Sequence, residues 1–323
     1  MDVLSDILRT LKVQGSLYFR TAFSSPWGVL VPRFANVARF HLVTRGACWV
    51  RVENAPAPIR MERGDLIVIL HGNEHHLLDD LATPPLAVDE VVKRAGYTGE
   101  GALVWGSEPA SEPTCMVCGH FTFDSERGAL LHGSLPNFIH VPHTEALNYG
   151  WLDDALKFIA HEAAASEPGG EAIVNRLSEI VFIQMIRRHA STSNQTKGLF
   201  AALADEKLRQ ALQAFHRSPA QVWTVDELAR AAAMSRTLFS ERMRDILGIP
   251  PMAYVAQWRM ERAHEALMDH RSSIPEVAEL FGYRSLSAFT RAFKRQFGRG
   301  PGEVRRGRSK SALAAESLHS KSG

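Results

Sequence analysis

The chain has 323 residues, of which 45% are hydrophobic and 22% charged, and its formal net charge at pH 7 is +2. This composition is ordinary for a globular protein with room for two cores, and it excludes a chain that is disordered throughout. No uncharged apolar run approaches the roughly 18 residues that a membrane span needs. The first residues, MDVLSDILRTLK, predict an amphipathic helix rather than a signal peptide. We therefore expect a cytoplasmic protein without a membrane partner.

The charge is divided unevenly along the chain. Residues 199–323 contain 20 Lys and Arg against 13 Asp and Glu, whereas residues 1–198 contain 17 against 22. A basic balance suits a partner with many negative charges. Only the C-terminal part is therefore expected to approach a polyanion such as nucleic acid.

Short stretches of β-type sequence follow one another between Leu17 and Pro142. They are SLYFRTAF, RFHLVTRGACWVRV, PIRMERGDLIVILH, TCMVCGHFTF and NFIHVP, with Gly, Pro and Asp clusters between them. Such regular short strands are typical of a sandwich or a small barrel. The segment from Asp80 to Pro113, rich in Pro, Gly and acids, is predicted to be a long loop.

The hydrophobic period changes from 2 to 3.6 at Trp151. WLDDALKFIAHEAAA and EAIVNRLSEIVFIQMIRRHA predict two helices, joined by the turn SEPGG and followed by a polar linker, STSNQTKG. The second helix contains Ile173, Leu177, Ile180, Val181 and Ile183 with few polar interruptions. It is therefore predicted to be buried on more than one side, either within its own domain or in a dimer interface between helix pairs.

An internal repeat occupies residues 224–251 and 273–301. Each copy opens with a Ser or Thr followed by Glu three positions later, Thr224 with Glu227 and Ser273 with Glu276, which is the spacing of a helix capping box. A short apolar helix, a tight turn and a second amphipathic helix follow. This layout is typical of a helix-turn-helix.

The second helix of each copy has an apolar stripe and an opposite polar face. The stripes are Phe239, Met243 and Leu247 in the first copy and Phe289, Phe293 and Phe297 in the second. The opposite faces carry Thr237, Glu241 and Arg244, and Ser287, Arg291 and Lys294. One charged helix face is usually only solvated, but two tandem copies on the basic half of the chain favour DNA binding, with Arg on guanine and Lys on phosphate.

The helix predicted between the copies, PMAYVAQWRMERAHEALMDH, has Tyr254, Trp258 and Leu267 to pack on both. A rigid spacer of this kind can hold two reading helices about 34 Å apart, one turn of DNA.

Residues 205–306 resemble the DNA-binding domain of the AraC family of transcriptional regulators, including both copies, the spacer and the closing turns. The resemblance implies base contacts by Arg236, Thr237, Ser240 and Glu241 in the first copy and by Leu286, Ser287, Thr290 and Arg291 in the second. Arg244 and Lys294 complete the predicted DNA-binding set. Glu241 stands where relatives often have arginine, so we expect the second copy, through Arg291, to carry more specificity. Double-stranded DNA, RNA polymerase and a second copy of the chain are the expected macromolecular partners.

The N-terminal part resembles the cupin-type sensors of the same family. The segment GDLIVILHGNEHHL, 64–77, is similar to the cupin pattern, and TCMVCGHF supplies a C-x-x-C pair. In cupins the metal ligands project inward from neighbouring strands, and C-x-x-C lets two thiolates share one zinc ion. His41, His75, Cys115 and Cys118 are therefore predicted to hold zinc. A site filled by protein side chains alone is structural or sensory rather than hydrolytic.

Several alternatives to this zinc site stay open. His71 or His76 could replace His75, and His120 is expected to be a surface or hydrogen-bonding residue. The cysteines could be a packed pair, or a thiol switch with Cys48 as the further candidate. An empty barrel could bind a small organic inducer between Trp27, Trp49 and Phe121. A cupin metalloenzyme is the competing class, disfavoured by thiolates where such enzymes hold carboxylates.

These observations predict an α+β chain of two domains. Residues 1–145 form a cupin-like β-barrel sensor, 146–198 a helical connector with possible dimerisation helices, and 199–308 an all-α double helix-turn-helix, followed by a disordered tail, 309–323. The predicted function is a sequence-specific DNA-binding transcriptional regulator, not an enzyme, that responds to a chemical signal at the cupin domain.

Overall fold

The computed structural model describes nearly all of the chain up to residue 306. The described residues are 2–11, 13–34, 37–106, 112–122, 129–146, 150–165, 167–192, 195–269 and 272–306, so the predicted tail lies outside them. None of the helices within these ranges is long and apolar enough to cross a membrane.

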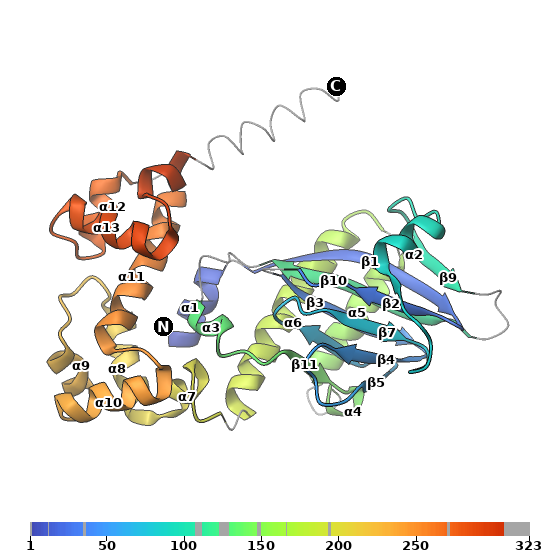
Figure 1. Ribbon diagram of the computed structural model, residues 1–323, viewed down its shortest axis with the longest axis horizontal. Helices are drawn as coiled ribbons and strands as arrows, with labels where there is room; N and C mark the ends of the chain where they lie inside the picture. Colours follow the sequence, from blue (N-terminus) through green and yellow to red (C-terminus); the bar gives the residue numbers. More distant parts are fainter. Residues whose placement is uncertain are drawn as a thin grey trace. The chain divides into compact units, whose positions relative to one another are not determined.

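The described residues form two compact units (Figure 1). The sheet unit comprises those within 12–124 and 135–192, and the helical unit those within 1–11, 125–134 and 193–323. These boundaries differ from the predicted ones. The connector helices belong to the sheet unit, and two parts of the predicted sensor, within 1–11 and 125–134, belong to the helical unit.

The sheet unit contains eleven described strands in two sheets. They are β1 (Gln14–Ser24), β2 (Gly28–Val31), β3 (Val37–Arg45), β4 (Ala47–Val52), β5 (Ile59–Glu62), β6 (Leu66–Ile69), β7 (His75–Leu78), β8 (Leu86–Ala87), β9 (Ala102–Gly106), β10 (Thr114–Thr122) and β11 (Phe138–Val141). The larger sheet has the order β11-β6-β3-β10-β1-β9 and the smaller one β5-β4-β7-β2-β8. No hydrogen-bonded pairing of described strands joins the two sheets, so the predicted barrel is instead an open, jelly-roll-like sandwich.

Alternation along the strands sorts the side chains of the larger sheet onto two buried faces. In β6, Ile67 and Ile69 join the core between the sheets, while Leu66 and Val68 point to the other face. The apolar run LIVI is continuous because both faces of this strand are covered.

The helices α5 (Gly150–Ala165) and α6 (Gly170–Thr192) cover that second face. Val181 and Met185 of α6 are buried, but Ile173 and Ile180 are 40% and 50% exposed. Within the single chain this helix is therefore buried on one side only, because its outer stripe faces away from the sheet.

The segment from 80 to 113 is also more ordered than predicted. Its described part contains β8, the helix α2 (Val88–Arg94) and β9, which pairs in parallel with β1. Val91 is fully buried in the core between the sheets, and this burial holds α2 in place. The short α3 (Ala129–His132) and α4 (His143–Ala146) precede and follow β11.

The helical unit contains the two predicted helix-turn-helix copies. Its helices are α1 (Val3–Leu11), α3, α7 (Leu199–Ala204), α8 (Glu206–Arg217), α9 (Val225–Ala231), α10 (Arg236–Leu247), α11 (Pro251–Met268), α12 (Ile274–Leu280) and α13 (Leu286–Phe297). Both predicted capping boxes are present, at Thr224 and Ser273. The second helices end at Gly248 and Gly298, where φ is 75° and 69°, a left-handed conformation that favours glycine.

Candidate nucleic-acid interface and sensor site

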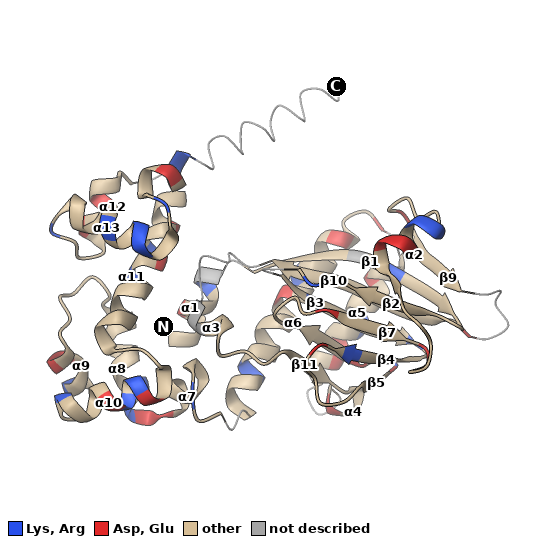
Figure 2. Cartoon of the chain, viewed as in Figure 1, with Lys and Arg blue, Asp and Glu red and all other residues tan. Residues whose placement is uncertain are grey.

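The second reading helix, α13, combines a buried aromatic stripe with an exposed basic face. Phe289 and Phe293 have no exposed surface and pack into a core with α11 and α12. On the other side, Arg291 and Lys294 are exposed. The remaining predicted reading residues start the helix or flank Arg291: Leu286 and Ser287 are exposed and Thr290 is half-buried. The helix contains no acid (Figure 2), so its exposed charges are all positive.

The first reading helix, α10, contains charged residues of both signs (Figure 2). Arg236, Thr237, Glu241 and Arg244 are exposed, and Ser240 is half-buried with its hydroxyl donating to the carbonyl of Arg236 at 2.8 Å. The Arg236 guanidinium also lies 3.4 Å from a carboxylate oxygen of Asp226 on α9. Because both partners are more than half exposed, this pair is weak and holds the Arg236 guanidinium only loosely.

The sequence did not reveal that α10 is tied to α8. Asp205, the N-cap of α8, accepts a hydrogen bond from the backbone N–H of Leu208 and pairs with Arg242 of α10 at 2.5 Å. Burial alone would raise the pKa of Asp205, but the hydrogen bond from Leu208 and the Arg242 guanidinium bring that pKa below its ordinary value. An Asp before a helix signals the cap, but nothing local signals the partner 37 positions away.

In the sheet unit, a buried chain of polar contacts links three of the four predicted zinc ligands. His41 on β3 and Cys118 on β10 are paired in register, and both point into the space between the sheets. The Nδ1 atom of His41 lies 3.1 Å from the Cys118 sulfur, and its Nε2 atom lies 2.8 Å from Nε2 of His75 on β7. His75 Nδ1 in turn lies 3.0 Å from the carbonyl oxygen of Asn73.

One arrangement of hydrogens satisfies every member of this chain. A carbonyl can only accept, so His75 donates through Nδ1 and accepts through Nε2; His41 then donates through Nε2 and accepts the Cys118 S–H at Nδ1. Burial lowers the pKa of His75 to about 4 and that of His41 well below its usual range. It also raises the pKa of the Cys118 thiol far above its usual value. All three side chains are therefore neutral at pH 7 in the absence of a metal.

Cys115 lies apart from these three side chains. Residues three apart on a strand point to opposite faces, and the β10–β3 pairing is irregular between Cys115 and Met116. The Cys115 sulfur is half-buried, 3.8 Å from the carbonyl of Pro113. Among the described residues, no group of three or more His, Cys, Asp and Glu side chains is arranged to hold a metal ion. The four-ligand set is thus not assembled with the side chains in these positions.

The alternative histidines point elsewhere. His71 approaches the carbonyl of Leu135 at 3.1 Å, and His76 faces Glu74 at 3.7 Å. Cys48 is fully buried in the same core as Cys118, and burial raises its pKa to about 12. Gly119, which separates Cys118 from His120, is needed there because a Cβ would lie 2.5 Å from the ring of Phe40.

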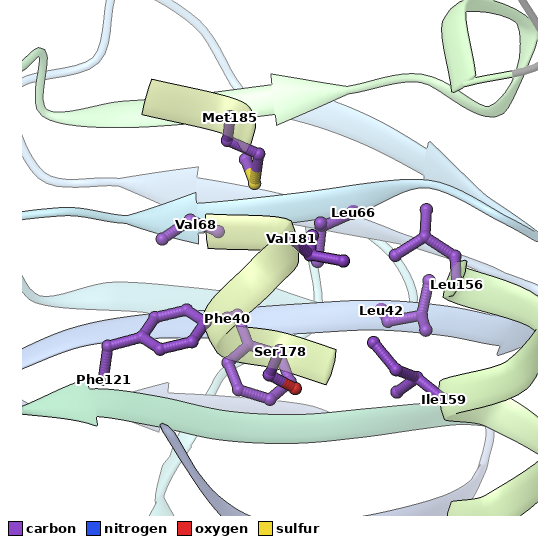
Figure 3. Close-up of a pocket in the computed structure, with 10 residues that line it drawn as sticks. All are labelled: Phe40, Leu42, Leu66, Val68, Phe121, Leu156, Ile159, Ser178, Val181 and Met185. Atoms are coloured by element: carbon purple, nitrogen blue, oxygen red, sulfur yellow. The ribbon is translucent and has the colours of Figure 1, made fainter. Parts of the chain in front are cut away.

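The three aromatic residues proposed to line an inducer pocket do not share one. Trp27 packs against Phe23 between the sheets, whereas Trp49 is half-buried under Arg60. Phe121 lines an apolar pocket on the opposite face of the larger sheet, against α5 and α6 (Figure 3). Its free volume of about 10 Å³ is far below what an organic ligand needs. An inducer there would have to move the helices.

Comparisons with known proteins agree with this architecture. A family model described as "Cupin" matches residues 2–191, and one described as "Helix-turn-helix domain" matches residues 228–307. An AraC-like transcription regulator of Streptomyces antibioticus is 31% identical over 315 residues, which cover 95% of this chain and 99% of that protein. The RCS-specific HTH-type transcriptional activator RclR of Escherichia coli is 30% identical over 311 residues, covering 94% and 97%. The solved DNA-binding domain of AdpA, in complex with a target DNA, is 30% identical, covering 30% of this chain and 87% of that one with a TM-score of 0.29.

The two units therefore define a regulator that combines a cupin-type sensor with a double helix-turn-helix reader. This chain belongs to the AraC family of DNA-binding transcriptional regulators with a cupin sensor domain. The predicted family, the division into a sheet-rich and a helical domain and the class of function are confirmed.

Proposed function

We propose that this regulator binds double-stranded DNA through α10 and α13, and that a chemical signal at the cluster of His41, His75 and Cys118 changes that binding. The observation that carries the proposal is the buried chain from Cys118 through both imidazoles to Asn73. A signal alters DNA occupancy only if it favours one arrangement of the molecule over another. Cytoplasmic location and contact with RNA polymerase follow as expectations from this role.

Zinc is the metal ion that we propose for this cluster, and the positions of the two imidazoles and the thiol fit a zinc site in part. His75 donates its second ring nitrogen to a carbonyl, as histidines that bind metals usually do. The two Nε2 atoms are 2.8 Å apart, somewhat closer than the about 3.3 Å expected for two nitrogens on one tetrahedral zinc. The Cys118 sulfur lies on the other edge of the His41 ring, so one side chain must turn for three donors to converge. Zinc would hold the thiol as thiolate, which oxidants attack.

Elemental analysis of the purified protein tests the site. One zinc per chain is expected, lost in His75→Ala and Cys118→Ser and kept in the matched control His71→Ala. Cys115→Ser tests whether Cys115 is the fourth ligand. Loss of zinc means that the pairing of β10 with β3 rearranges at Cys115, where it is irregular, and retention means that Cys115 is not a ligand. A wild type free of metal would contradict the zinc proposal and leave a thiol switch between buried cysteines, with Cys48 the partner of Cys118.

We also infer that the regulator is a homodimer through the outer faces of α5 and α6. Four large apolar side chains there are 40–50% exposed: Trp151, Phe158, Ile173 and Ile180. They follow helical spacing on two packed helices, a pattern suited to a matching face on a second copy.

Light scattering after size exclusion tests the dimer. Phe158→Glu and Ile180→Glu should convert the dimer to a monomer, because each places a carboxylate in an apolar interface. Val104→Glu is the matched control, since Val104 is 65% exposed on β9, the edge strand of the larger sheet, and not on either helix. A wild-type monomer, or dimers in all three variants, would contradict this interface.

The regulator is not expected to be an enzyme. Its relatives are named as regulators, and the cluster consists of two imidazoles and a thiol. Metal oxygenases of the cupin kind usually pair histidines with a carboxylate.

A further inference from the structure

The N-terminal helix α1 is part of the DNA-binding unit, although it precedes the sensor in the chain. It groups with the helical unit and packs on α8 and α11. Its apolar residues Val3 and Ile7 are 2% and 5% exposed. Burial of this stripe is what holds an otherwise short helix in place.

A buried polar chain fixes the register of α1 on the other two helices. A carboxylate oxygen of Asp6 lies 2.7 Å from Nδ1 of His216 on α8, and Nε2 of the same ring lies 2.7 Å from the hydroxyl of Tyr254 on α11. The side chains of Asp6 and His216 are 3% and 1% exposed, and Tyr254 is equally buried. Trp258 packs edge-on against the imidazole of His216, with the two ring centroids 4.8 Å apart.

Such a chain is specific because each member depends on the next. A buried polar group left without its partner loses the free energy of its hydration with nothing in exchange. Removal of Asp6 would therefore leave the His216 imidazole without a partner at Nδ1, and the ring would be held less firmly against the hydroxyl of Tyr254. Sliding α1 by one residue would break the chain in the same way.

The three helices that meet here decide where the reading helices lie. The helix α8 packs on α9, the first helix of the first helix-turn-helix copy, and α11 is the spacer that leads to the second copy. We infer that Asp6, His216 and Tyr254 are positioning residues for DNA recognition, and that the functional reader begins at α1 and not at α7. They touch no base; they hold α8 and α11 at the angle at which α10 and α13 match their two half-sites.

The thermodynamic consequence is a change in the fraction of molecules competent to bind. When an arrangement is only partly populated, the apparent dissociation constant rises by the inverse of that fraction. Loss of a network that holds the competent arrangement should therefore weaken binding, and should also blur the preferred distance between the half-sites.

The test uses the full chain and a DNA duplex that the wild-type protein has selected from a random-sequence pool. Fluorescence anisotropy gives the dissociation constant for this duplex and for the same duplex with one base pair inserted between the half-sites. Asp6→Ala should bind the selected duplex about tenfold more weakly and discriminate less against the inserted base pair. Asp6→Asn, which keeps an acceptor for His216, should lose less.

Asp2→Asn is the matched control, because Asp2 is exposed and caps the start of the same helix. It should leave both dissociation constants unchanged. Tyr254→Phe removes one hydroxyl only and provides a second variant if Asp6→Ala does not fold; it should weaken binding in the same direction. A lower Tm with unchanged affinity and unchanged discrimination would reduce the network to a stability role and overturn the inference. Tighter binding by Asp6→Ala would also overturn it, since α1 would then restrain the reader.

Discussion

The two helix-turn-helix copies share one backbone layout and differ in the charge that their second helices expose. Each begins with a capping box, and each second helix ends at a left-handed glycine. Yet α10 contains Glu241 and Asp245 beside its arginines, whereas α13 contains three basic residues and no acid.

The ion pairs of the two second helices add to this difference in exposed charge. Two arginines of α10 face carboxylates, Arg236 toward Asp226 and Arg242 toward Asp205. Among the described residues, Arg291 and Lys294 of α13 form no ion pair and are open to solvent. Caps and apolar stripes thus give both copies the same backbone layout. Their outer faces differ: that of α13 is strongly basic, and that of α10 has mixed charge.

The largest expected effect is a loss of stability confined to one of the two helix-turn-helix copies. Phe293→Ala removes a fully buried ring that packs on Phe289 and Phe297 at centroid distances of 5.6 and 4.6 Å. We expect a loss of about 3–5 kcal/mol in stability, because a cavity remains. Hydrogen exchange should show faster opening of α12 and α13 with little change in α9 and α10. Phe239→Ala should give the reverse pattern, and equal opening of both copies in either variant would mean that they unfold as one.

Arg291→Ala should cost about 1–3 kcal/mol of DNA-binding free energy and relax base preference at one position. Arg244→Ala is the matched change on α10 and should cost less, since α10 offers DNA a face of mixed charge. Binding to a set of single-base variants of the selected duplex measures both effects. A uniform loss over all sequences would assign Arg291 to phosphate alone, and a larger loss for Arg244→Ala would reverse the ranking of the two copies.

The helical unit was predictable because its signals are local. Capping residues, stripes of period 3.6 and terminal glycines lie within a few positions of one another, and each was found where the sequence placed it. The inward direction of His41 and Cys118 was equally local, since strand alternation decides it. The expected convergence of Cys115 and Cys118 was not met because their spacing, which suits a turn, falls within a strand.

What the sequence could not reveal depends on contacts between distant positions. Asp6 and His216 are 210 positions apart, and no local pattern marks either as a partner. The helix α2 was missed because its short turn-rich segment is ordered by burial of Val91 in a core built elsewhere. The closure of a barrel likewise depends on strand edges, which residue patterns do not specify.

Asp205→Ala should destabilise the first copy by about 0.5–2 kcal/mol, because it removes the N-cap of α8 together with the partner of Arg242. The folded-state pKa of Asp205 is lowered, so this contribution is complete above the ordinary value of 3.8 and is lost as pH falls through the folded-state pKa. The difference in Tm between wild type and variant should therefore shrink below pH 3.8. Asp205→Asn keeps the cap and should lose less at neutral pH; a pH-independent difference would show that the charge does not contribute.

The smallest expected effect concerns phosphate contacts on the basic reader. Lys294→Ala should change affinity little at high salt but reduce the slope of log K against log salt by about one, because one fewer counterion is released. Lys93→Ala on α2 is the matched control, an exposed lysine that belongs to the sheet unit. Anisotropy titrations over a salt series give the two slopes. If Lys294→Ala leaves the slope at the wild-type value, the outer face of α13 does not lie along the phosphates, and the charge difference between the copies would then act through Arg291 alone.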